Sequence, residues 1–104
     1  MSTPSSPFAN LQAKTAQHWL DFIKTELALC FTFSTIAARK YETGNRQTAA
    51  KSMANAEKAY ETVIQFLSDP KRSKHLTGEE SQDITAELGR LREKLDGLIR
   101  ESRK

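Results

Sequence analysis

Residues 84–98 read ITAELGRLREKLDGL, and this stretch decides the fold class of the chain. Its aliphatic side chains recur at alternating steps of four and three residues, the spacing of the hydrophobic seam in a left-handed helix bundle. The seam consists of Ile84, Leu88, Leu91, Leu95 and Leu98. The remaining faces of the segment are largely charged. We therefore expect an α-helix that buries one face against neighbouring helices.

Turn-forming and capping residues delimit this helix and two others. Pro7 suits a first helical position, and Gly44 can take the left-handed conformation that ends a helix. Asn45 is a preferred N-cap for the second helix, while Thr77 and Glu80 predict a capping box at the start of the third. The expected helices span about residues 7–43, 46–68 and 78–102, after a disordered tail at residues 1–6.

The second expected helix repeats the rhythm of the third. Its seam consists of Ala49, Met53, Ala56, Tyr60, Val63 and Leu67. Because the two seams match in period, we expect an all-α fold, an antiparallel up-down-up three-helix bundle with a long first helix. A chain of 104 residues, of which 38% are hydrophobic and 28% charged, fits one such domain at residues 7–104.

The first expected helix carries more apolar surface than two neighbouring helices cover. One stripe consists of Leu20, Ile23, Leu27, Cys30, Ala37 and Tyr41, and a second of Phe22, Leu29, Phe33 and Ile36. Two neighbours bury roughly 100–160° of a helix surface, so the second stripe lacks an intramolecular partner. We therefore expect a homodimer that completes the bundle through the first helix. The candidate interface residues are Trp19, Phe22, Glu26, Leu29, Phe33 and Ile36.

The length of the first helix favours the same interpretation. About 35 residues make a helix of about 52 Å, which is roughly 15 Å longer than its expected neighbours. This overhang would carry Phe8, Leu11, Trp19 and Leu20, which would be exposed in a monomer.

Glu26 lies between the two apolar stripes, where a buried carboxylate is costly unless it has a partner. One hypothesis pairs it with a Lys or Arg of another helix. The other makes it a polar residue that fixes the register of the subunit interface. The sequence leaves both open.

Residues 33–60 resemble one tetratricopeptide unit. The matching positions are Ala37, Tyr41, Gly44, Asn45, Ala49 and Ala56. The resemblance implies a tight antiparallel helical hairpin. Stacked arrays of such units bind extended peptides, so the resemblance also suggests peptide binding as a function. An array normally needs three or more units, and this chain shows one.

No set of residues in the chain has the spacing of a catalytic or metal site. His18 and His75 are far apart in sequence, and Cys30 lies in an apolar run that predicts a core thiol. The chain has no glycine-rich phosphate loop and no Glu-x-x-His pair. We expect no enzyme activity, no cofactor and no metal, and instead a helical protein–protein interaction or scaffold domain.

A short basic segment favours an alternative function. Between the second and third helices lie Lys71, Arg72, Lys74 and His75, in a chain of net charge +3. These residues predict an anion or nucleic-acid contact, which would be larger if folding brought Arg100, Arg103 and Lys104 close to them. A nucleic-acid-binding accessory protein is therefore the competing hypothesis, and a small enzyme is the third. Whether the first helix meets a second copy or an unidentified protein partner stays open.

The longest apolar run, Leu27 to Ala38, is about 12 residues, whereas a membrane span needs about 20. A single cysteine cannot form an internal disulfide. Together these features favour a cytoplasmic protein without a membrane contact.

Overall fold

A computed structural model of the chain describes the backbone of residues 7–103 and the side chains from Thr15 onward. This part of the chain holds four helices and no strand, which confirms the all-α fold class. The helices are α1 (Pro7–Glu42), α2 (Arg46–Ser68), α3 (Pro70–Ser73) and α4 (Gly78–Ser102). The expected ranges for the three long helices agree with these bounds to within about one residue, whereas α3 was not expected. The predicted tail at residues 1–6 lies outside the described residues.

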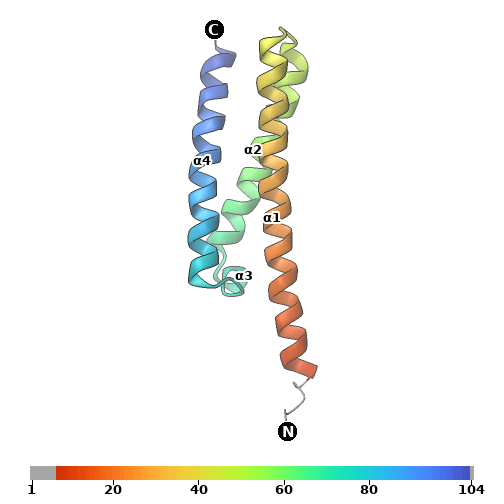
Figure 1. The fold of residues 1–104 in the computed structure, drawn as a ribbon, viewed down its shortest axis with the longest axis vertical. Helices are drawn as coiled ribbons and strands as arrows, with labels where there is room; N and C mark the ends of the chain where they lie inside the picture. Colours follow the sequence, from red (N-terminus) through yellow and green to blue (C-terminus); the bar gives the residue numbers. More distant parts are fainter. Residues whose placement is uncertain (1–6, 104) are drawn as a thin grey trace.

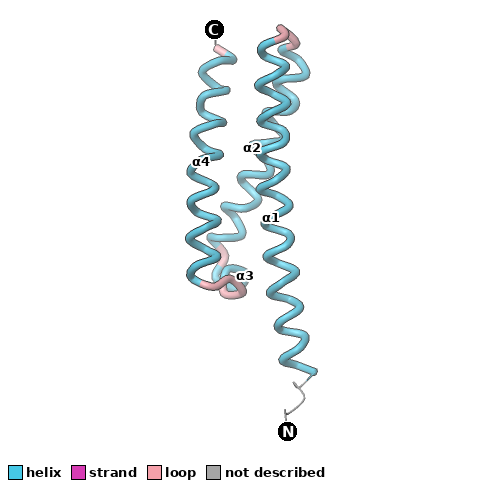
Figure 2. The backbone as a smooth tube through the Cα atoms, in the orientation of Figure 1, coloured by secondary structure: helices cyan, strands magenta, loops and turns pink. Residues whose placement is uncertain are grey.

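The three long helices lie side by side in an elongated molecule of 65 × 20 × 19 Å (Figure 1). α2 returns antiparallel to α1, and their contact is the most extensive in the molecule. α3 and the adjoining turns then reverse the chain, so that α4 runs in the same direction as α1 (Figure 2). The N-terminal part of α1 extends beyond α3 and the adjacent ends of α2 and α4.

The helix ends follow the capping signals of the sequence. Gly44 has a φ of +80°, in the left-handed region that disfavours other residues. The Asn45 side chain accepts a hydrogen bond from the Thr48 amide at 3.2 Å. In the predicted capping box, Thr77 Oγ1 accepts from the Glu80 amide at 3.0 Å, and the Glu80 carboxylate accepts from the Thr77 amide at 2.9 Å. These three predictions are confirmed.

One half of the core is built from large side chains. This large-residue cluster consists of Ile23, Val63, Phe66, Leu76, Ile84 and Leu88. Trp19 and Leu20 pack against it, and the Trp19 ring centroid lies 5.4 Å from that of Phe66. The prediction that Trp19 and Leu20 stand on an exposed overhang is therefore wrong, because α2 reaches far enough along α1 to cover them. The side chains of Phe8 and Leu11 lie outside the described part of the chain.

The other half of the core is built mainly from small side chains. This small-residue cluster consists of Cys30, Ala56, Ala59, Leu91 and Leu95. Ser34, Ala37 and Ala49 are also fully buried. The Ser34 hydroxyl donates to the Phe31 carbonyl at 2.8 Å, so its burial leaves no unpaired donor. Small side chains on both helices allow α1 and α2 to approach each other closely here.

The predicted seam of α4 is confirmed, because all five of its aliphatic side chains are buried. The predicted seam of α2 is confirmed at Ala49, Ala56 and Val63, whereas its other three residues pack at the edge of the core. Met53, Tyr60 and Leu67 are only half-buried, and the residues immediately before them, Ser52, Ala59 and Phe66, are buried instead. Over residues 46–59 α2 therefore turns the smaller side chains Ser52 and Ala59 inward, whereas near its end it buries the large ring of Phe66. Tyr60 lies at the edge next to α4, with the Arg92 guanidinium 5.0 Å from its ring.

Candidate interaction surface

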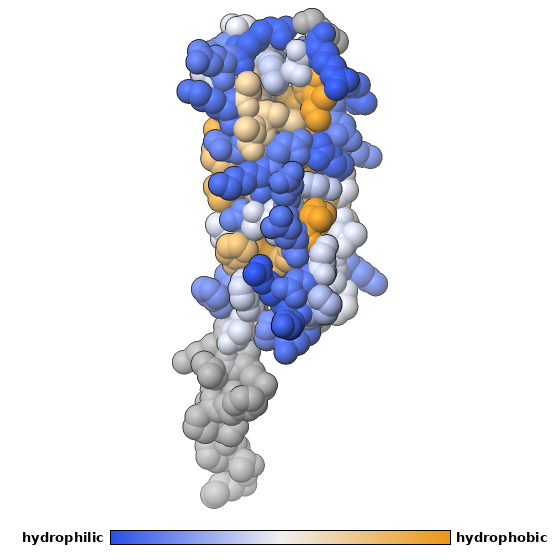
Figure 3. Space-filling view, turned by 180° about the vertical axis from the view of Figure 1, so that it is seen from behind, coloured by the Kyte–Doolittle hydropathy of each residue, from blue (hydrophilic) through white to orange (hydrophobic). Residues whose placement is uncertain are grey.

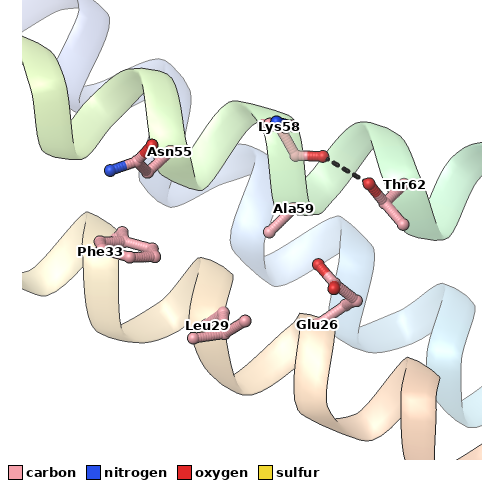
Figure 4. A pocket seen from close by; sticks show the side chains of 7 residues that line it. All are labelled: Glu26, Leu29, Phe33, Asn55, Lys58, Ala59 and Thr62. Carbon is pink, nitrogen blue, oxygen red and sulfur yellow. Dashed lines mark hydrogen bonds between the residues drawn. The ribbon is translucent and has the colours of Figure 1, made fainter.

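An open groove runs between α1 and α2, with α4 passing behind both helices (Figure 4). From α1 it is lined by three of the predicted interface residues, Glu26, Leu29 and Phe33, whose side chains point toward α2. From α2 it is lined by Asn55, Lys58, Ala59 and Thr62. We call this feature the α1–α2 groove.

The floor of the α1–α2 groove is apolar and partly open to solvent. Leu29 is 39% exposed, although a leucine side chain is usually buried. Phe33 is half-buried and packs against the small-residue cluster. The groove therefore presents apolar surface that the rest of the described chain does not cover.

Glu26 contributes the negative charge of the groove. It is half-buried, and it forms no ion pair with any side chain that the structure describes. The hypothesis that Glu26 pairs with a Lys or Arg of another helix of the same chain is therefore wrong for residues 15–103.

The other three predicted interface residues lie further along α1. Trp19 and Phe22 are half-buried and pack against the large-residue cluster, with their rings edge to face at 6.0 Å. Phe22 thus has intramolecular contacts that the sequence did not predict. Ile36 continues the line of the groove into a second hollow, which is lined by Ile36, Arg39, Lys40 and Thr43.

On the face of the molecule seen from behind, the apolar surface is divided into small patches. Viewed from behind, the apolar side chains reach the surface in separate areas between charged ones (Figure 3). Phe31 is the most exposed large hydrophobic residue of the described chain, at 54%, but the Lys94 ammonium lies 4.1 Å from its ring centroid. The Phe31 ring therefore already has a cation–π partner.

The basic segment predicted to contact anions forms α3 and the turn after it. Asp69 caps α3 by accepting from the Lys71 amide at 3.0 Å, and it also pairs with the Arg72 guanidinium at 3.4 Å. Arg72 in addition lies 5.7 Å from the Trp19 ring centroid, so it is engaged within the molecule. Lys71 and Lys74 are exposed, and His75 is half-buried.

The chain terminus does not enlarge this basic segment. α3 lies beside the first turn of α4, whereas Arg100 and Arg103 lie at the opposite, C-terminal end of that helix (Figure 1). The condition that folding brings the two groups together is therefore not met for Arg100 and Arg103, because the whole length of α4 separates them from α3. Lys104 lies outside the described residues. Nucleic-acid binding thus remains a prediction that rests on Lys71 and Lys74.

The strongest polar contact between helices was not predicted. The Arg92 guanidinium of α4 donates to both carboxylate oxygens of Glu57 on α2, at 2.9 and 3.1 Å, and it also bonds Asp96 at 3.0 Å. The hydrogen bond to Glu57 raises the pKa of Arg92 above its usual range. The step from Arg92 to Asp96 is visible in the sequence as a pair four residues apart, but nothing in the sequence marks Glu57 as the partner across helices.

The residues that could support catalysis are not grouped. Cys30 is fully buried, and this burial raises the pKa of its thiol above the usual value of 9.0, which disfavours the reactive thiolate. His18 is exposed on α1 and contacts Trp19 edge to face. Among the described residues, no three His, Cys, Asp or Glu side chains are placed to hold a metal ion.

Within the described part of the chain, each helix falls short of the length or the apolar character that crossing a membrane requires.

Comparison of the chain with protein-family models, with curated proteins and with solved structures finds no match.

Proposed function

We propose that this protein is a non-enzymatic helical interaction domain that self-associates through α1. In this proposal the three long helices of each copy form an up-down-up bundle. A second copy covers its open side and completes a homodimer. The observation that supports the proposal is the α1–α2 groove, where Leu29 and Phe33 leave apolar surface open beside the unpaired carboxylate of Glu26.

A second copy of the chain suits this groove for reasons of symmetry. Two-fold pairing is the commonest way for a soluble protein to associate, and it buries the same apolar patch on both partners. α1 follows the long axis of a rod-shaped molecule, so two copies can align their α1 helices over several turns. Such an interface would keep its apolar residues at the centre and its charged residues at the rim.

Light scattering after gel filtration, over a series of protein concentrations, tests the proposal. At tens of micromolar we expect twice the chain mass of 11.7 kDa, and on sufficient dilution we expect the mass of the single chain. The substitution Phe33→Glu should give a monomer that keeps its helical circular dichroism, because a carboxylate in the groove would have to be desolvated in the dimer.

The matched control is Phe31→Glu, on the same helix but outside the groove. Phe31 is the more exposed of the two rings, and Lys94 is positioned to pair with a carboxylate at this position. This variant should therefore remain dimeric. A wild-type protein that is monomeric over the whole concentration series would overturn the proposal, as would equal loss of the dimer in both variants.

A further inference from the structure

We infer that the two α1 helices of the dimer run antiparallel, with Glu26 of each chain facing Arg39 and Lys40 of the partner subunit. This inference rests on the proposed self-association and adds the orientation and the charge pairs that fix it. It follows from the positions of the unpaired charges on the open face of α1.

The open face of α1 has the spacing of a second helix seam. Its residues follow one another at steps of three and four: Glu26, Leu29, Phe33, Ile36 and Lys40. Phe22 continues this spacing toward the N-terminus, but it packs against the large-residue cluster. The two most central positions, Leu29 and Phe33, lie in the α1–α2 groove. An antiparallel partner centred between them sets Leu29 against Phe33 of the partner subunit, and Glu26 against Ile36 of the partner subunit.

In that register the opposite charges come together. Arg39 and Lys40 lie within about one helical turn of Ile36, a span that their long side chains can bridge. Both residues line the second hollow of α1, and neither forms an ion pair with the described part of the chain. Each copy thus offers one carboxylate at one end of the open face and two cations at the other, none of them in an ion pair with residues 15–103.

A parallel arrangement would bring like charges together. About a two-fold axis parallel to the helices, Glu26 would face Glu26 of the partner subunit, and Lys40 would face Lys40 of the partner subunit. Like charges placed across an interface disfavour that pairing, so the charge pattern selects the antiparallel dimer. Among the described residues, Lys58 on α2 is the cation that lines the groove itself, so it is the alternative partner for Glu26.

Charge reversal measures the proposed pairs. In the antiparallel dimer, Glu26→Lys should raise the dimer Kd at least about tenfold, and so should the double variant Arg39→Glu/Lys40→Glu. Combining all three substitutions restores opposite charges at both ends and should bring the Kd back toward the wild-type value. Lys58→Glu tests the alternative partner inside the groove and should raise the Kd less than either of the first two variants. The control is Lys71→Glu, at an exposed position on α3 outside the groove, which should leave the Kd at the wild-type value.

Spin labels report the orientation independently of affinity. Labels at Asp21→Cys should lie about 30 Å apart along the helices of an antiparallel dimer, because residue 21 is ten positions from the centre and each residue rises 1.5 Å. Labels at Thr32→Cys, next to the centre, should be close together. Cys30 stays in place because it is buried.

The outcomes separate the inference from the proposed function. A monomeric wild-type protein overturns both. A dimer whose Kd is unchanged by Glu26→Lys, or whose labels at position 21 are as close as those at position 32, overturns the antiparallel pairing and leaves the self-association standing. A dimer that depends on Lys58 instead of Arg39 and Lys40 also overturns it.

Discussion

The two halves of the core bury their helices in opposite ways. In the large-residue cluster, Phe66 and Ile23 are fully buried and fill the space between the helices. In the small-residue cluster, α1 and α2 contribute Cys30, Ala56 and Ala59. These small side chains occupy little volume, so the two helices can pack closely. The large side chains of α1 in this half, Leu29, Phe31 and Phe33, lie outside the core or at its edge.

This difference explains where the open apolar surface lies. A helix pair that approaches closely has no room for phenylalanine in its interface, so the large side chains of the same helical turns stay on the outer faces. The candidate interaction surface therefore overlies the small-residue half of the core. The large-residue half covers most of its own apolar side chains, Trp19 and Phe22 among them.

The largest effect should come from emptying the large-residue cluster. Phe66→Ala removes a fully buried ring from the contact with Trp19 and should cost about 3–5 kcal/mol of unfolding free energy. Urea denaturation at one fixed protein concentration measures it, since dimerisation adds to the apparent stability. Phe31→Ala, at an exposed ring, should cost less than about 1 kcal/mol. Similar costs for both would mean that the cluster does not hold the fold.

The small-residue cluster should respond to added volume. Ala56 is fully buried between the helices, so Ala56→Leu should force them apart and cost about 1–3 kcal/mol. Its neighbour Ala54 is exposed on the same helix, and Ala54→Leu should change the stability by less than about 0.5 kcal/mol. If Ala56→Leu were neutral in the same denaturation assay, the contrast between the two halves would be lost.

The polar contact beside the small-residue cluster should have a moderate effect. Arg92→Ala leaves Glu57 half-buried without its partner and should cost about 1–2 kcal/mol. Arg90→Ala is the matched control, because Arg90 pairs only with Glu87 on its own helix, and such exposed pairs contribute about 0.3–0.5 kcal/mol. Equal effects would show that the contact between α2 and α4 adds nothing beyond a surface pair.

The smallest effect should be a gain, on a helix face outside both halves of the core. Nothing lies within 4 Å of a methyl group added at Gly89, so Gly89→Ala should raise the stability by about 0.5–1 kcal/mol through the lower entropy of the unfolded chain.

Gly44→Ala should do the opposite and lower the melting temperature, because its φ of +80° strains a residue that has a Cβ atom.

The sequence predicted the elements of the fold better than their packing. The ends of α2 and α4 follow from Asn45, Thr77 and Glu80, because a cap is a local interaction within one turn. The inward face of α2 could not be predicted, because two stripes one residue apart have the same period. Whether Ala59 or Tyr60 is buried depends on where α1 and α4 lie, and the sequence of α2 alone does not give those positions.

Sequence spacing within α1 predicts part of the groove, whereas the packing between helices determines the rest. Glu26, Leu29 and Phe33 share one face of α1, so their proximity is a matter of helix geometry alone. That Lys58 and Thr62 complete the groove depends on the register between α1 and α2. That α3 and the end of α4 lie far apart depends on the direction of α4, which residue spacing does not reveal.

The elongated shape of the molecule has a consequence for its hydrodynamics. The radius of gyration is 17.6 Å, whereas a compact domain of this length has about 13 Å. Such a rod experiences more frictional drag than a sphere of equal mass and tumbles more slowly about its short axes. A single chain would therefore elute early from a sizing column, at the position of a heavier globular protein, and only a direct mass measurement distinguishes it from a pair.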